Sequence, residues 1–175
     1  MYDPHFWLDP NNVIKQTEII GEKIVHIDTP NTQYYLENIT SFQEQLLKLD
    51  QKYKNELASC TTRTIITSHN AFEYLAHQYN LEIISISGLS PEQEPSPKKM
   101  IEVIEKVKEK NIQYIFFETL VSPKLSETIA SEVGAKTLVL NPIEGLSEEE
   151  ISNGKNYIKV MEENLKNLKT ALTCQ

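Results

Sequence analysis

The sequence has little cysteine and glycine, a single tryptophan and no long apolar run. Two cysteines in 175 residues argue against a fold held by many disulfides and against a cysteine-rich zinc module. No apolar stretch approaches the roughly 20 residues that a membrane-spanning helix needs. What the chain does have is 39% hydrophobic residues with only five glycines, which indicates a folded chain with one substantial core rather than disorder.

Positive charge is also scarce. The chain carries 17 Lys and Arg against 25 Asp and Glu, a formal net charge of −8 at pH 7, and the basic residues never form a long run. Proteins that bind nucleic acid gain most of their affinity by neutralising phosphates with Lys and Arg. We therefore expect no nucleic-acid partner, and no attachment to an anionic membrane surface through basic residues.

The N-terminal segment, MYDPHFWLDP, lacks the charged and apolar regions of a signal peptide. Taken alone, the sequence therefore predicts either a cytosolic protein or a protein whose start is missing.

The two cysteines, Cys60 and Cys174, lie 114 positions apart, and neither has a second Cys or a nearby His at metal-finger spacing. Two alternatives stay open on spacing alone. The residues either form a disulfide that ties the start of the C-terminal region to its end, or they are two unpaired thiols.

Two helices are predicted at the start of the chain. Asp9-Pro10 is a favoured helix start, and apolar residues then recur at helical spacing to about Ile27. Thr29-Pro30 repeats this start signal, and the following stretch to about Ala58 contains no glycine and no internal proline. This second helix would be roughly 40 Å long. A helix of that length usually connects two lobes or packs along the whole body of one.

From Cys60 onward, short β-rich runs alternate with amphipathic helices. This alternation predicts the α/β class, with a four-stranded parallel sheet, helices on both faces and right-handed crossovers. The expected strands are 64–67, 82–86, 113–117 and 136–140, and the expected helices are 71–79, 97–110, 123–133 and 147–171.

Residues of ligand type follow the predicted strands. In open parallel sheets, ligands bind beyond the carboxyl ends of the strands. His69 and Glu118 follow the first and third predicted strands, and Glu144 follows the fourth, so one imidazole and two carboxylates converge on one edge. His5 lies in a Pro- and Asp-rich segment that predicts a structured loop before a helix.

Two histidines with a carboxylate suit zinc, since neutral imidazole and carboxylate oxygen are common zinc ligands. His5 and His69 are 64 residues apart, however, which is no short metal motif. From spacing alone, a histidine at a strand end is more often a hydrogen-bonded cap or a core neighbour, and this alternative stays open.

Four segments carry a resemblance to a known family. DPHFWLDP, SHNAFEYLA, ISGLSPEQEPSP and KTLVLNPIEGLSEEE, in this order, resemble the substrate-binding proteins of bacterial zinc ABC importers of the ZnuA and AdcA type. The resemblance extends over the whole chain. It implies two α/β lobes joined by one long helix, with the metal bound in the cleft between the lobes. It also implies a periplasmic or extracellular protein, membrane-anchored in its full-length form, that captures Zn²⁺ and delivers it to an ABC permease without catalysis.

The resemblance also implies roles for individual residues. His5 and His69 match the metal-ligand histidines of the family motifs, and Glu144 matches the carboxylate ligand. Glu118 and Ser68 are expected just behind the ligands, with Glu118 orienting a ligating imidazole through its other ring nitrogen. Manganese-binding relatives usually carry Glu at the position of His69, so His69 favours Zn²⁺, and Mn²⁺ is the alternative ion.

Complete members of the family are longer than this chain. The resemblance therefore divides it into residues 1–28, a remnant of the N-terminal lobe, residues 29–59, the interlobe helix, and residues 60–175, the C-terminal α/β lobe. The secretion signal, and most of the N-terminal lobe with a further ligand, are expected to be absent. Exposed apolar faces on the first two helices then favour self-association.

Two other functions are compatible with parts of the sequence. A zinc hydrolase also uses two histidines, a carboxylate and an open position, and Glu118 would be its only candidate general base. An adhesin role follows from names that some relatives carry, and no residue here supports it independently.

Overall fold

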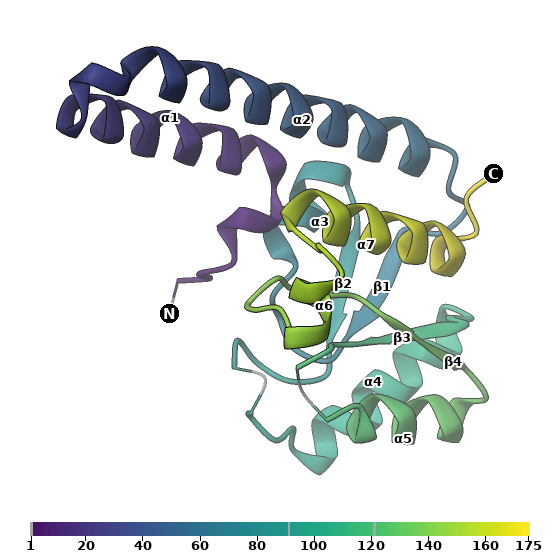
Figure 1. Ribbon diagram of the computed structural model, residues 1–175. Helices are drawn as coiled ribbons and strands as arrows, with labels where there is room; N and C mark the ends of the chain where they lie inside the picture. The colour runs from purple at the N-terminus through teal and green to yellow at the C-terminus, as the bar shows by residue number, and fades with distance from the viewer. Residues whose placement is uncertain (1, 91, 121) are drawn as a thin grey trace.

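The computed structural model describes residues 2–90, 92–120 and 122–175, which form a two-helix arm and an α/β body (Figure 1). A four-stranded parallel sheet lies at the centre of the body, in the order β2-β1-β3-β4. Its strands are β1 (Thr64–Thr67), β2 (Glu82–Ser85), β3 (Tyr114–Phe117) and β4 (Lys136–Val139). The parallel sheet predicted from the alternation of β-rich runs and helices is thus confirmed, with strand ends that differ by at most one residue.

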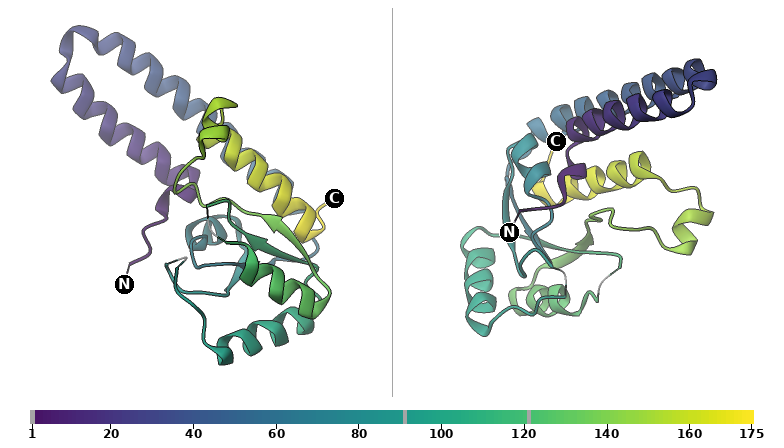
Figure 2. Two further views of the ribbon diagram at one scale, coloured as in Figure 1. Left: turned by 60° about the horizontal axis from the view of Figure 1, so that its bottom comes forward. Right: turned by 90° about the vertical axis from the view of Figure 1, so that its left-hand side faces the viewer.

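The helices cover both faces of this sheet, as predicted (Figures 1 and 2). One face is covered by α3 (Glu73–Tyr79), α7 (Tyr157–Leu172) and the C-terminal half of the long helix α2. The other face is covered by α4 (Pro97–Glu109) and α5 (Lys124–Val133). A sheet buried on both sides explains why the strands read as continuous apolar runs rather than as alternating ones.

Neighbouring strand residues supply the two cores. Ile65 and Phe116 lie in the core beneath α2, α3 and α7, whereas Ile66 and Ile115 lie in the core beneath α4 and α5. All four side chains are at most 1% exposed. Since successive side chains of a strand point to opposite faces, a one-residue slip of register would exchange the two sets, so this pattern specifies the pairing.

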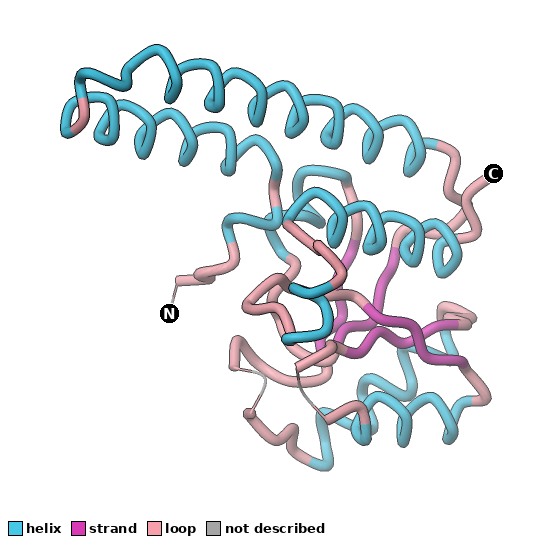
Figure 3. The backbone as a smooth tube through the Cα atoms, in the orientation of Figure 1, coloured by secondary structure: helices cyan, strands magenta, loops and turns pink. Residues whose placement is uncertain are grey.

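The arm consists of α1 (Pro10–Ile27) and α2 (Thr32–Ala58), joined by a short 3-10 turn, η2 (Thr29–Asn31) (Figure 3). Asp9 caps α1 by accepting a hydrogen bond from the backbone of Asn11, with proline in the first turn. Gly21 lets the two helices approach closely, because a Cβ there would lie 2.3 Å from Cδ1 of Ile39. Within the described residues, no helix combines the length and the apolar character that crossing a membrane requires.

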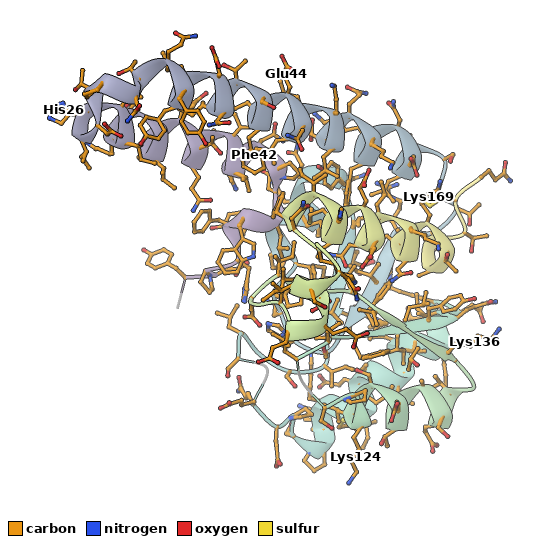
Figure 4. All side chains as sticks on the ribbon, viewed as in Figure 1. His26, Phe42, Glu44, Lys124, Lys136 and Lys169 are labelled. Carbon is orange, nitrogen blue, oxygen red and sulfur yellow. A yellow bond between two sulfur atoms is a disulfide. The ribbon has the colours of Figure 1, made fainter. Side chains whose placement is uncertain are left out.

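The free end of the arm carries exposed apolar residues. Ile27 is 82% exposed and Tyr34 is 64% exposed, and His26 lies exposed at the same end (Figure 4). Ile27 and Tyr34 belong to the exposed apolar faces on which the predicted self-association depends. The opposite end of the arm is anchored to the body, because Leu8, which precedes α1, is fully buried in the core.

The last predicted helix, 147–171, is wrong as a single element. The chain forms α6 (Glu148–Ser152) and, after a loop, α7. Ser147 and Glu150 build a capping box that starts α6, and Gly154, with a φ of +67°, turns the chain out of it. Asn156 then caps α7 by accepting a hydrogen bond from the backbone of Lys159. The Asn-Gly stop signal and the second cap therefore override the continuous helical periodicity.

A disulfide joins Cys60 to Cys174 and closes the body, so the structure resolves the alternative that spacing left open. The bond ties the segment after α2 to the residues after α7. Hydrogen bonds flank it, with the Ser59 hydroxyl donating to the carbonyl of Gln175 at 2.8 Å and the amide of Thr62 donating to the carbonyl of Leu172 at 3.3 Å. The first and last parts of the body are thus joined next to the sheet.

We expect the double variant Cys60→Ser/Cys174→Ser to unfold more easily. A cross-link over 114 residues removes loop entropy from the unfolded chain worth up to about 4 to 5 kcal/mol in the chain-entropy model. Urea denaturation of both proteins, with and without reductant, measures the difference. Reductant should lower the midpoint of the parent and leave that of the double variant unchanged, and equal midpoints for parent and variant without reductant contradict the prediction.

Candidate metal site

Three side chains from separate segments meet at the carboxyl edge of the sheet. His5 precedes the short 3-10 helix η1 (Phe6–Leu8), His69 follows β1, and Glu144 lies in the loop after β4. One candidate ligand atom from each lies within 4.8 Å of the other two. Oε1 of Glu144 is 3.1 Å from Nε2 of His5 and 4.0 Å from Nε2 of His69. The fold therefore brings together the three residues singled out from the sequence.

His5 is held by a side chain that the sequence reasoning did not select. Oδ1 of Asp3 accepts hydrogen bonds from the backbone amide of His5 at 3.0 Å and is 2.7 Å from its Nδ1. His5 is only 1% exposed, and Nε2 is the nitrogen that faces Glu144. The available signal was the spacing, because an Asp that bonds the amide two residues onward is a common turn device.

A carboxylate also contacts the Nδ1 atom of His69. Its ring is fully buried, and Nδ1 lies 2.6 Å from Oε1 of Glu118, which also accepts a hydrogen bond from the hydroxyl of Ser68. Thr67 fixes the backbone, since its hydroxyl donates to the carbonyl of His69 at 2.9 Å. Glu118 therefore contacts the ring nitrogen that points away from His5 and Glu144.

The remaining nitrogen of His69 is the most informative atom of the site. Nε2 is buried and has no hydrogen-bond partner among the described residues. Leaving a buried polar atom unpaired costs roughly 1 to 3 kcal/mol, so native structures usually avoid it. A cation between the three side chains would pair this nitrogen.

Trp7 joins the segment of His5 to the loop of Glu144. Its Nε1 donates a hydrogen bond to the carbonyl of Pro142 at 2.8 Å, two residues before Glu144. The Tyr157 hydroxyl donates to the carbonyl of Trp7 at 2.8 Å. Burial raises the pKa of Tyr157, with a smaller contribution from the charge of Asp9, so the phenol keeps the proton that it donates.

A buried carboxylate fixes the start of α1 to the body. Asp50 on α2 is 5% exposed and accepts hydrogen bonds from Asn11 at the start of α1 and from Gln78 and Tyr79 on α3, each at 3.1 Å. Burial alone would raise the pKa of Asp50, but hydrogen bonds from Lys54, Gln78 and Asn11 together outweigh it and hold this pKa below its usual value. The ionised carboxylate thus connects three helices close to the segment of His5.

The donor set and its dimensions suit a divalent cation with a preference for nitrogen ligands. Tetrahedral zinc with bonds of about 2.0 to 2.1 Å places its ligand atoms roughly 3.3 Å apart. The distances of 3.1 and 4.0 Å from the carboxylate oxygen to the two imidazoles are close to this spacing. Each imidazole already has a carboxylate on its other nitrogen, an arrangement that recurs behind metal-bound histidines.

An α/β body with two buried imidazoles and a carboxylate at its carboxyl edge has the features of a metal-binding protein. The sequence profile of the ZnuA family, described as the periplasmic component A of a zinc-uptake complex, matches residues 2–171. The chain belongs to this family.

Relatives of this chain are named for zinc. It is 42% identical over 170 residues to the high-affinity zinc uptake system protein ZnuA of Bacillus subtilis, covering 97% of this chain and 53% of the relative. It is 42% identical over 168 residues to the zinc-binding lipoprotein AdcA of Streptococcus pneumoniae, covering 96% of this chain and 34% of the relative. The chain thus spans about half or less of the length of these two relatives.

A solved structure gives the same likeness in three dimensions. The Zn(II)-bound ZnuA-like domain of Streptococcus pneumoniae AdcA superimposes with a TM-score of 0.84 at 42% sequence identity. The match covers 98% of this chain and 64% of that structure.

The carboxylate behind His69 predicts a specific tautomer. We expect the neutral His69 ring to carry its proton on Nδ1, because that nitrogen lies 2.6 Å from Glu118, and to leave Nε2 bare. Long-range ¹H–¹⁵N spectra of the metal-free chain distinguish the two ring nitrogens. The Glu118→Leu variant serves as the control and should lose this preference, whereas a proton on Nε2 in the parent contradicts the prediction.

Proposed function

We propose that this chain binds Zn²⁺ through Nε2 of His5, Nε2 of His69 and the carboxylate of Glu144. The observation that carries the proposal is the buried, unpartnered Nε2 of His69 within the 4.8 Å cluster. A cation removes the cost of that unpaired nitrogen, and it neutralises the carboxylate that faces the two rings. A remaining coordination position is left for water or another donor.

The residues behind the site prepare the two rings for a metal. Asp3 and Glu118 each lie within hydrogen-bond distance of Nδ1 of one histidine. In the proposed zinc-bound state each accepts the proton of that nitrogen, so that each Nε2 presents its lone pair to the ion. A carboxylate on the far nitrogen also raises the basicity of the ligating one. The preference is for zinc over manganese, because imidazole-rich sites suit zinc and oxygen-rich sites suit manganese.

The role of the whole protein follows from this site and from the family. We propose that it captures Zn²⁺ outside the cytoplasmic membrane, attached to the membrane by a lipid anchor, and delivers the ion to the permease of an ABC importer. The names of the Bacillus subtilis and Streptococcus pneumoniae relatives, a zinc uptake protein and a zinc-binding lipoprotein, support this proposal.

Binding rather than hydrolysis is the activity that the geometry favours. A zinc hydrolase needs a general base beside the metal-bound water. Glu118, the residue considered for that task, contacts Nδ1 of His69, on the far side of the ring from Nε2. The carboxylate is thereby used to orient a ligand.

We expect one Zn²⁺ to bind per chain, and the variants His69→Ala and Glu144→Ala to weaken binding by at least about tenfold each, as loss of a direct ligand should exceed the effect of outer partners. Calorimetric titration of the metal-free chain measures the affinity. Trp7, the single tryptophan, provides a second signal, since its ring lies 5.5 Å from that of His5.

His77→Ala is the matched control for this titration, because His77 is an exposed histidine on α3 outside the cluster. It should bind Zn²⁺ like the parent. Unchanged affinity in His69→Ala, or equal losses in His69→Ala and His77→Ala, would overturn the proposed site.

The choice between ions should depend on residue 69. Replacing the imidazole in His69→Glu gives two carboxylates and one histidine, an oxygen-rich set that manganese prefers. Competition between Zn²⁺ and Mn²⁺, followed by Trp7 fluorescence, should show a lower ratio of zinc to manganese affinity in the variant. An unchanged ratio counts against His69 as a ligand.

A further inference from the structure

The residue before Glu144 has an unusual backbone. Ile143 has a φ of +57°, in the left-handed region that β-branched residues rarely adopt. The left-handed conformation is sterically unfavourable for any residue with a Cβ atom. Such a conformation persists only where surrounding groups fix it, and fixed strain of this kind concentrates at functional sites.

Asn141 supplies the group that fixes Ile143. Its Oδ1 accepts a hydrogen bond from the backbone amide of Ile143 at 2.7 Å, and its Nδ2 donates to the hydroxyl of Thr119 at 3.1 Å. Asn141 is only 4% exposed. Its side chain therefore spans the loops that follow β3 and β4, and it holds the turn from which the carboxylate of Glu144 projects.

Asn164 on α7 holds Asn141 in turn. Oδ1 of Asn164 accepts from the backbone amide of Asn141 at 2.8 Å, and Nδ2 of Asn164 donates to the carbonyl of Asn141 at 2.7 Å. One amide side chain thus pairs with both backbone groups of one residue, as a neighbouring strand would. The amide of Leu140 still bonds to the carbonyl of Phe117 in β3. At the next residue, Asn141, the side chain of Asn164 takes over the backbone hydrogen bonds.

Packing alone does not explain why an asparagine occupies position 164. The residue is 1% exposed and lies among Met161, Leu165 and Leu168, which form the buried face of α7. An amide in an apolar core is unfavourable unless its hydrogen bonds are made, and a leucine would fit the pattern of the helix. The amide serves to bind the backbone of the loop.

We propose that Asn141 and Asn164 are positioning residues that set the location of the Glu144 carboxylate, and thereby the affinity of the site for its metal ion. This inference rests on the proposed zinc site. The relay runs from α7 through the backbone and side chain of Asn141 to the strained Ile143, and then to Glu144. Neither asparagine contacts the ion.

A double-mutant cycle tests this relay, with Zn²⁺ alone as the probe. We expect Asn141→Ala to weaken Zn²⁺ binding roughly tenfold, the scale seen when residues behind metal ligands are removed. Asn141→Ser should restore part of the affinity, since a serine hydroxyl makes the same kind of turn more weakly. In the Glu144→Ala background, Asn141→Ala should have no further effect.

Matched variants on α7 separate positioning from general stability. Nδ2 of Asn167, on the same helix, donates to the carbonyl of Val139 at 2.8 Å, at the end of β4 and two residues before Asn141. Asn167→Ala should lower the melting temperature of the metal-free chain and keep the parent affinity. Asn164→Ala should lower both the melting temperature and the affinity.

The outcomes distinguish the two proposals. Equal losses caused by Asn141→Ala in the parent and in the Glu144→Ala background, or equal affinities of Asn164→Ala and Asn167→Ala, overturn the positioning role and leave the zinc site intact. Unchanged Zn²⁺ affinity in Glu144→Ala alone overturns the proposed ligand set instead.

Discussion

The proposed zinc site depends on one constraint, which is that the Nε2 atoms of two buried imidazoles must both be available at the same point. Water normally satisfies such an atom, but His5 and His69 are at most 1% exposed. The chain meets the constraint by placing a carboxylate, Asp3 or Glu118, on the other nitrogen of each ring. These contacts fix the orientation of both rings. Nε2 of His5 faces Glu144 at 3.1 Å, but Nε2 of His69 has no partner among the described residues, and a cation would remove the cost of that unpaired nitrogen.

The fold supplies the fixed frame that this arrangement needs. The three residues of the proposed site come from segments far apart in the sequence, and each segment is tied to rigid structure. The turn of His69 follows a central strand, Trp7 connects the segment of His5 to the loop of Glu144, and Asp50 connects the start of α1 to α2 and α3. A site that is ordered before the ion arrives loses little binding free energy to ordering.

Parts of this fold and of the candidate site could be predicted from the sequence on physical grounds. The alternation of apolar runs and helices determines a parallel sheet, and parallel strands direct His69, Glu118 and Glu144 to one edge. No comparable rule connects His5 to that edge, because it lies 64 residues from His69, and only the family resemblance selected it. Trp7 and Asn164 were missed, since their roles arise from tertiary hydrogen bonds that no local pattern encodes. Asp3 was missed although its bond to the amide of His5, two residues onward, is a local turn pattern. The break between α6 and α7 has a local signal in Asn153-Gly154 and in the Asn156 cap. The prediction missed it because apolar residues recur at helical spacing across the break.

The three side chains of the proposed site also differ in their exposure to solvent. Both imidazoles are buried, whereas the Glu144 side chain is 34% exposed, so the carboxylate is the most solvent-accessible of the three groups. A mobile carboxylate at that position would bind weakly and would accept many cations. The left-handed turn at Ile143 and its bond to Asn141 limit the positions that Glu144 can take. The strained turn at Ile143 therefore has a physical consequence in the proposed relay, because it restricts the most exposed of the three groups through the backbone rather than through burial.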